Sequence, residues 1–184
     1  MLQAAGGDSL RLFIRDAARW VRPQQVADPD EISFLVALRL LIRHPPLRAM
    51  AWFRLGQWCR DAGVRGVSGY VQRRLLRLYG LELAPSTPVA GGLYIAHPVG
   101  CVLHAVSIGE NVTVVGQVTF GTLEDGVWPS IGDRAFLGVG ARVLGGISIG
   151  VDAKIGANAV VLGDVPPGST AVGVPARLLT DRTS

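Results

Sequence analysis

The stretch Ile131–Val161, "IGDRAFLGVGARVLGGISIGVDAKIGANAVV", carries an aliphatic residue at every sixth position without a slip. Glycine directly follows four of these positions, as in "IGD" and "IGA". Neither an α-helix nor a sandwich strand has a six-residue period, whereas a solenoid with triangular coils places one hexapeptide on each of its three faces. The inward aliphatic residues stack between coils, and glycine or small polar residues relieve the corners. This stretch therefore predicts a parallel β-helix.

The same period extends back towards Gly80, with two breaks in its register. We expect one extra residue between Ile95 and Val102, and five between Phe120 and Ile131, within "GTLEDGVWPS". A solenoid tolerates insertions at its corners, where they protrude as loops that often bind ligands. Both breaks therefore mark candidate site regions. The upstream inward positions are predicted to be Leu83, Val89, Ile95, Val102, Ile108, Val114 and Phe120.

The first part of the chain has the three- and four-residue apolar spacing of amphipathic helices, from Ser9 to Tyr79. Proline and glycine interrupt it in "RPQQVADPDE", "RHPPLR" and "DAGVRG", which predicts about four helices, the last ending in "YVQRRLLRLYG". We expect a helical segment over residues 1–80, the β-helix over 81–171 and a C-terminal tail over 172–184.

The composition argues against a nucleic-acid-binding, disulfide-rich or metal-binding protein. With 184 residues, 49% of them hydrophobic, and 24 glycines, the chain is long enough for one good core. The net charge of +4 comes from arginines, since Lys154 is the only lysine, but no nucleic-acid motif accompanies them. Cys59 and Cys101 have neither disulfide nor metal-ligand spacing and are predicted to be reduced, buried thiols.

No apolar run approaches the roughly 20 residues that a membrane span needs, and no signal-peptide pattern opens the chain. We therefore expect a cytoplasmic protein. The arginine-rich helices leave open an alternative of peripheral contact with the inner membrane surface, although a solvated helix face shows the same pattern.

Several segments narrow the hexapeptide pattern to a family: "YVQRRLLRLYGLEL", "HPVGCVLH", "WPSIGD" and "VVLGDVPPGSTAVGVPAR". From about His44 to Arg177 the chain resembles the hexapeptide-repeat acyltransferases, and among them the serine acetyltransferases. The resemblance implies a mainly β fold, a left-handed parallel β-helix after an α-helical segment. It also implies a homotrimer with active sites between subunits, acetyl-CoA as co-substrate and no required metal.

The resemblance implies that His97 is the general base and that Glu82 orients it, with the family's fifteen-residue separation kept. Histidine suits this role because its ordinary pKa of about 6.5 lets it take and return a proton near neutrality. One coil is about eighteen residues, so we expect the two side chains to lie nearly one turn apart, close enough to touch.

The acceptor positions depart from the family pattern. Ala96 stands where serine acetyltransferases have Asp before the catalytic His, and Val127, Trp128 and Pro129 replace "RHP", whose Arg and His hold the serine carboxylate. A free amino acid needs partners for both of its charges, because an unpaired charge in a site costs several kcal/mol. Trp128 instead offers a flat face of the kind on which sugars stack.

We therefore expect a sugar of a polysaccharide or its precursor as the acceptor, as in the exopolysaccharide branch that includes colanic acid acetyltransferase. L-Serine is the alternative acceptor, and a non-catalytic β-helix scaffold is a further alternative. Ala96, Gln117 and Trp128 are the expected acceptor-side residues, with Gln117 lining the cleft near the thioester.

By resemblance, acetyl-CoA is expected to contact six residues, for which the alternatives are coil corners and solvated side chains. These residues are Gly140, Ala141, Lys154, Gly156, Ala157 and Arg177.

Three other residues are not expected to be central to the site. His104 matches no functional position of the family. Its alternative role is that of a second base or of a residue that binds the acceptor. His44, in "RHPP", is expected at a helix boundary, and Cys101 is not expected to act as a nucleophile.

Overall fold

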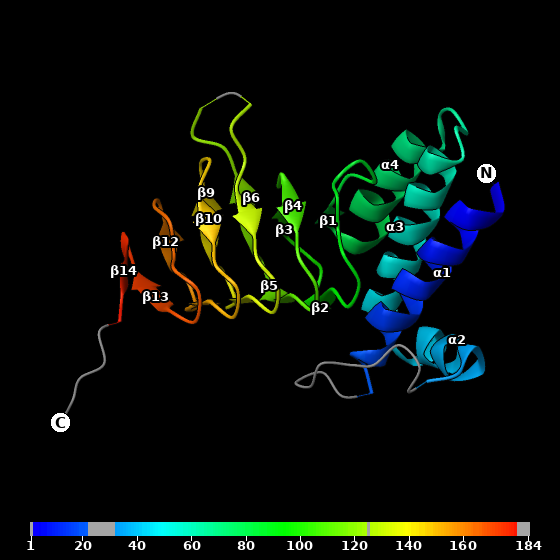
Figure 1. Ribbon diagram of the computed structural model, residues 1–184, viewed down its shortest axis with the longest axis horizontal. Coiled ribbons are helices and arrows are strands. Elements are labelled where there is room, and N and C mark those ends of the chain that lie inside the picture. Colours follow the sequence, from blue (N-terminus) through cyan, green and yellow to red (C-terminus); the bar gives the residue numbers. More distant parts are fainter. Residues whose placement is uncertain (1, 22–31, 125, 180–184) are drawn as a thin grey trace.

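The computed structural model describes residues 2–21, 32–124 and 126–179 of the chain. Four helices form one end of this part of the molecule, and a β-solenoid extends from them to the far end (Figure 1). The mainly β fold, a parallel β-helix preceded by helices, is confirmed. No described helix is long and apolar enough to cross a membrane.

The helices begin and end at residue types that stabilise helix termini. They are α1 (Leu2–Ala18), α2 (Phe34–Arg43), α3 (Pro45–Asp61) and α4 (Val67–Tyr79). Ser33 caps α2 by accepting a hydrogen bond from the Val36 amide, and Pro45 opens α3, where its missing N–H is not needed. Gly80 ends α4 with φ 59°, as a left-handed C-cap. The predicted break "RPQQVADPDE" lies outside the described residues.

The helices pack unequally. Met50 and Phe53 of α3 and Leu75 of α4 are fully buried between the helices and the first coils. On α2, in contrast, Leu35 and Ile42 are 69% and 74% exposed. The helix that the apolar spacing predicts here is confirmed, but the apolar face of α2 is largely uncovered in the single chain.

Three parallel sheets form the faces of the solenoid, each named here by its first strand. The β1 face runs β1 (Leu81–Glu82), β3 (Cys101–Leu103), β6 (Thr119–Gly121), β9 (Arg142–Leu144) and β12 (Val160–Val161). The β2 face runs β2 (Tyr94–His97), β5 (Thr113–Gly116), β8 (Phe136–Leu137), β11 (Lys154–Ile155), β13 (Thr170–Gly173) and the antiparallel β14 (Ala176–Leu178). The β4 face runs β4 (Ser107–Ile108), β7 (Ser130–Ile131) and β10 (Ser148–Ile149).

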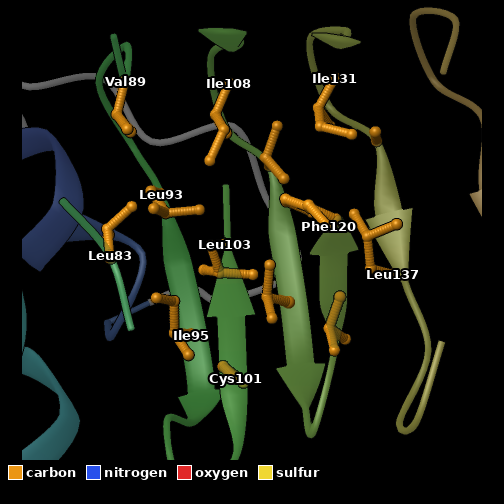
Figure 2. Packing of buried hydrophobic residues seen from close by; sticks show 14 of the residues in the cluster. Leu83, Val89, Leu93, Ile95, Cys101, Leu103, Ile108, Phe120, Ile131 and Leu137 are labelled. Carbon is orange, nitrogen blue, oxygen red and sulfur yellow. The ribbon is translucent and has the colours of Figure 1, made fainter. Parts of the chain in front are cut away.

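The core is a set of aliphatic stacks between these faces, and Figure 2 shows its first coils. All six positions of the uninterrupted register are buried as predicted, each directly above its equivalent one coil away. These positions are Ile131, Leu137, Val143, Ile149, Ile155 and Val161.

The predicted inward position Val102 is wrong, because Leu103 points into the core in its place (Figure 2). Leu103 is fully buried and pairs with Phe120, whereas Val102 is half-buried and faces outward. Two extra residues therefore separate Ile95 from Leu103, rather than one before Val102. Val102 and Leu103 are both aliphatic, so the pattern alone does not distinguish them, although a shift of one residue exchanges the faces of a strand.

The second break in the register is the predicted loop. Residues 122–124 and 126–129 leave the solenoid between β6 and β7 and rise above the neighbouring corners (Figure 1). The amide of Val106 donates to the Pro129 carbonyl at 2.9 Å, which returns the loop to the β4 face. At the other end of the solenoid, residues 172–179 of the expected C-terminal tail continue β13 and form β14.

A buried ion pair joins the helices to the first coil. Asp16 of α1 accepts two hydrogen bonds from the guanidinium of Arg54 in α3 and two more from the amides of Gly92 and Leu93. Arg54 also donates to the carbonyls of Val89 and Ala90. Neither charged side chain is more than 2% exposed, so each depends on the other.

Candidate active site

The β1 face presents Glu82 and His104 side by side on its outer surface. Glu82 pairs in register with Val102, and side chains alternate along a strand, so Glu82, Val102 and His104 point outward while Leu103 points inward. Glu82 and His104 are therefore diagonal neighbours on one face, within reach of each other's polar atoms.

A hydrogen bond joins the two side chains. His104 Nε2 lies 2.9 Å from Glu82 Oε1. An ionised carboxylate can only accept hydrogen bonds, so in this pair Nε2 of His104 carries a proton. The side chains are 26% and 41% exposed, which leaves the pair open to a molecule from solvent.

The loop between β6 and β7 places Trp128 against the same histidine. The ring centroids of Trp128 and His104 lie 5.3 Å apart at an interplanar angle of 43°. Glu82 thus engages one edge of the imidazole, and the Trp128 ring packs beside it at a tilt. We call Glu82, His104 and Trp128 the acidic-aromatic cluster.

His97 lies at the end of β2, just before the corner that leads to β3. Its side chain is exposed, and it pairs in register with Gly116. A Cβ on Gly116 would lie 3.0 Å from His97 Cβ, so the glycine leaves the room that His97 occupies. The thiol of Cys101 donates to the His97 carbonyl at 3.4 Å, across the same corner.

His97 and Glu82 lie on either side of this corner, His97 on the β2 face and Glu82 on the β1 face. The amide of Gly100 donates to the Gly80 carbonyl at 2.9 Å, which sets the chain before Glu82 over the turn that follows His97. Among the described residues, however, the hydrogen bond of Glu82 goes to His104, and none joins Glu82 to His97. The fifteen-residue spacing thus brings Glu82 and His97 to one corner, while the residue that pairs with Glu82 follows β3.

The other acceptor-side predictions lie around the same corner. Ala96 is half-buried on β2, next to His97. Gln117 is exposed just beyond β5 with φ 54°, and its side chain lies over Gly100, since a Cβ on that glycine would be 3.5 Å from Gln117 Cγ. The backbone carbonyl of Gln117 accepts a hydrogen bond from Arg142.

The residues predicted to bind the cofactor divide into two groups. Gly140 (φ 72°) is a coil corner whose Cβ position is occupied by the Asn158 side chain, and Ala141 is fully buried in the core. Gly156 is covered by Val172. These three can offer a ligand only their backbone atoms.

Lys154, Ala157 and Arg177 are exposed. Lys154 lies on β11 and Arg177 on β14, both in the sheet of the β2 face and towards the C-terminal end of the solenoid. They are the predicted cofactor residues whose charged side chains are available to phosphate groups.

Both cysteines are buried free thiols, as predicted. Burial raises the pKa of the Cys101 thiol, which disfavours the nucleophilic thiolate.

The chain is similar to known enzymes over most of its length. It is 36% identical over 145 residues to the serine acetyltransferase of Helicobacter pylori, covering 77% of this chain and 85% of the relative. The chain belongs to the serine acetyltransferase family. It is therefore an acyltransferase. Two longer members, from Mycobacterium tuberculosis and Escherichia coli, are 34% and 32% identical, and the chain spans 64% and 62% of their lengths. No family model matches the sequence.

Solved structures of the family share the fold. A soybean serine acetyltransferase apoenzyme matches with a TM-score of 0.80 at 30% identity, over 94% of this chain and 69% of that one. The Neisseria gonorrhoeae enzyme in complex with serine matches with a TM-score of 0.78 at 30% identity, over 97% and 72%. A serine acetyltransferase complex with CoA matches with a TM-score of 0.65 at 29% identity, over 72% and 56%. The predicted closeness to the exopolysaccharide branch is not supported by these relatives, which are serine acetyltransferases.

Proposed function

We propose that this chain transfers an acetyl group from acetyl-CoA to the hydroxyl of L-serine. The relatives favour serine over the sugar acceptor that the sequence suggested, and related structures bind serine and CoA. The observation that supports this class of reaction is that the Glu82 carboxylate lies at the same corner of the coil as His97 and His104. A carboxylate beside imidazole groups is suited to moving a proton from a hydroxyl.

His97 is the general base in this proposal. It takes the proton of the serine hydroxyl while the oxygen attacks the thioester carbonyl carbon of acetyl-CoA. The carbonyl electrons move onto oxygen, where a backbone N–H stabilises the charge. When the carbonyl re-forms, the C–S bond breaks, and the CoA thiolate takes the proton from the His97 imidazolium. The products are O-acetylserine and CoA.

Glu82 is the orienting carboxylate in this proposal. Its Oε1 holds His104, and among the described residues Oε2 accepts no hydrogen bond. A carboxylate can serve two imidazoles, one on each oxygen. Glu82 therefore has an oxygen available for His97 across the corner that both residues flank.

The remaining predicted residues keep their roles within the proposal. Lys154 and Arg177 supply positive charge for the nucleotide phosphates of acetyl-CoA, while Gly140, Ala141, Gly156 and Ala157 supply backbone groups. Subunits of a homotrimer would place the β2 face of one chain next to its neighbour, with the active sites between them.

A sugar hydroxyl is the second candidate acceptor. It is favoured by the half-buried aromatic ring that Trp128 contributes beside His104. Sugars commonly stack on such a surface, whereas serine has no group that does so.

The first test measures CoA release from acetyl-CoA with L-serine or with a panel of nucleotide sugars. We expect serine-dependent release that falls roughly 10²–10⁴-fold in kcat in His97→Ala, with the acetyl-CoA KM unchanged. His44→Ala is the matched control, because His44 stacks on Trp20 at 4.6 Å among the helices. Release with a sugar alone would move the acceptor to the second candidate, and full activity of His97→Ala would contradict its role as base.

A further inference from the structure

We propose that His104 recognises the carboxylate of the acceptor. This inference rests on the proposed function and adds the group that selects an amino acid over other hydroxyl compounds. It starts from the acidic-aromatic cluster, in which His104 is held on two sides.

The first step is the orientation of the ring. Nε2 of His104 is engaged by Glu82 at 2.9 Å, and the tilted Trp128 ring packs beside the imidazole with its centroid 5.3 Å away. Nδ1 is the remaining polar atom of the side chain, and no described residue accepts from it or donates to it. The pair therefore presents one unpartnered nitrogen on the outer surface of the β1 face.

The second step is the charge. An imidazolium donates from both nitrogens at once, so His104 can give one N–H to Glu82 and the other to a second carboxylate. An acceptor carboxylate beside Trp128 would lose hydration, and an unpaired charge there is costly. The geometry thus matches an anion at Nδ1, with Glu82 opposite it across the ring.

The third step compares the other cations on the outer faces. Arg142 of β9 donates through Nη1 to the carbonyls of Gln117, Gly140 and Ala141, so these backbone groups hold its guanidinium. Arg134 forms a two-pronged ion pair with Asp152. Val127 and Trp128 bring no charge to the loop. Within the described residues of the cluster, His104 is the side chain able to carry positive charge.

The test compares two acceptors that differ only in this carboxylate. L-Serine and L-serinamide carry the same hydroxyl, but serinamide has a neutral amide. Values of kcat/KM for both are measured at pH 7 for the wild type, His104→Asn and the control His44→Asn. Asparagine keeps an N–H for Glu82 but carries no charge. Thermal unfolding verifies that each variant is folded.

We expect the wild type to prefer serine and His104→Asn to lose most of that preference. Loss of one charge-assisted hydrogen bond corresponds to roughly a 10- to 150-fold fall in kcat/KM for serine, mainly through KM. Serinamide kinetics and the acetyl-CoA KM should change about twofold or less, and His44→Asn should behave as the wild type.

Three results would overturn the inference, and they differ from one another. An unchanged serine-to-serinamide ratio in His104→Asn would show that another group holds the carboxylate. An equal fall in kcat for both acceptors would place His104 in proton transfer. A wild type that releases CoA only with sugars would overturn the serine proposal together with this inference.

Discussion

At the scale of single residues, two ion pairs of the described part of the chain lie where the helices meet the coils, and they differ in burial. Asp16 and Arg54 are almost completely buried, and burial raises the pKa of the Asp16 carboxyl while Arg54 and two backbone amides oppose that rise. Arg15 and Glu110 form a similar two-pronged contact, but these side chains are 21% and 47% exposed. Solvent screens the second pair and not the first.

We therefore expect Asp16→Asn to lower the free energy of unfolding by about 3–5 kcal/mol, because it leaves the Arg54 charge buried without its partner. Glu110→Gln is the matched control and should cost at most about 1 kcal/mol. Urea unfolding of both variants measures the difference. Equal losses would show that the burial of the Asp16 pair does not matter for stability.

At the scale of elements, the close approach of successive coils positions His97. β2 and β5 lie in register, and Gly116 stands beside His97 with no side chain between them. A methyl group there would meet His97 Cβ at 3.0 Å and the His97 carbonyl oxygen at 3.1 Å. The placement of the proposed base thus depends on a glycine nineteen positions further along the chain.

Gly116→Ala should therefore lower kcat by a larger factor than it lowers the equilibrium constant for folding. A displaced base is no longer aligned with the hydroxyl proton that it must take, and a shift of about 1 Å can cost roughly 10²-fold in rate. Gly163→Ala is the control, since no atom lies within 4 Å of a Cβ there. Steady-state kinetics with L-serine, beside thermal unfolding, separates the two effects. If both variants keep the wild-type kcat, the tight contact has no role in positioning His97.

The six-residue period predicted the strands well wherever it ran without a break. It failed at β3, because Val102 and Leu103 are equally aliphatic and only their pairing with the next coil decides which one faces inward. The position of His104 depends on this choice, because it faces outward beside Glu82 only when Leu103 is the inward residue of β3.

At the scale of the whole molecule, the solenoid exposes apolar side chains that a single chain does not cover. Phe136 is 41% exposed and Leu162 is 50% exposed, on two different faces. The homotrimer proposed above, in which neighbouring β2 faces would form the acetyl-CoA sites, would cover Phe136.

We expect light scattering after size exclusion to give three times the chain mass of 19.5 kDa. Acetyl-CoA bound between subunits should raise the unfolding midpoint and oppose dissociation on dilution, since a ligand stabilises the state that binds it. CoA release that stays constant per chain in a purely monomeric sample would contradict a site between subunits.

The sequence by itself determined the coil, because a six-residue aliphatic period fits no other regular structure, and it brought Glu82 and His97 to the same corner. Only the tertiary structure decided which imidazole the Glu82 carboxylate binds and that Trp128 packs beside it. Those contacts depend on the alternation of side chains within β3 and on the path by which a loop returns to the solenoid. Both arise from packing between coils and not from local sequence.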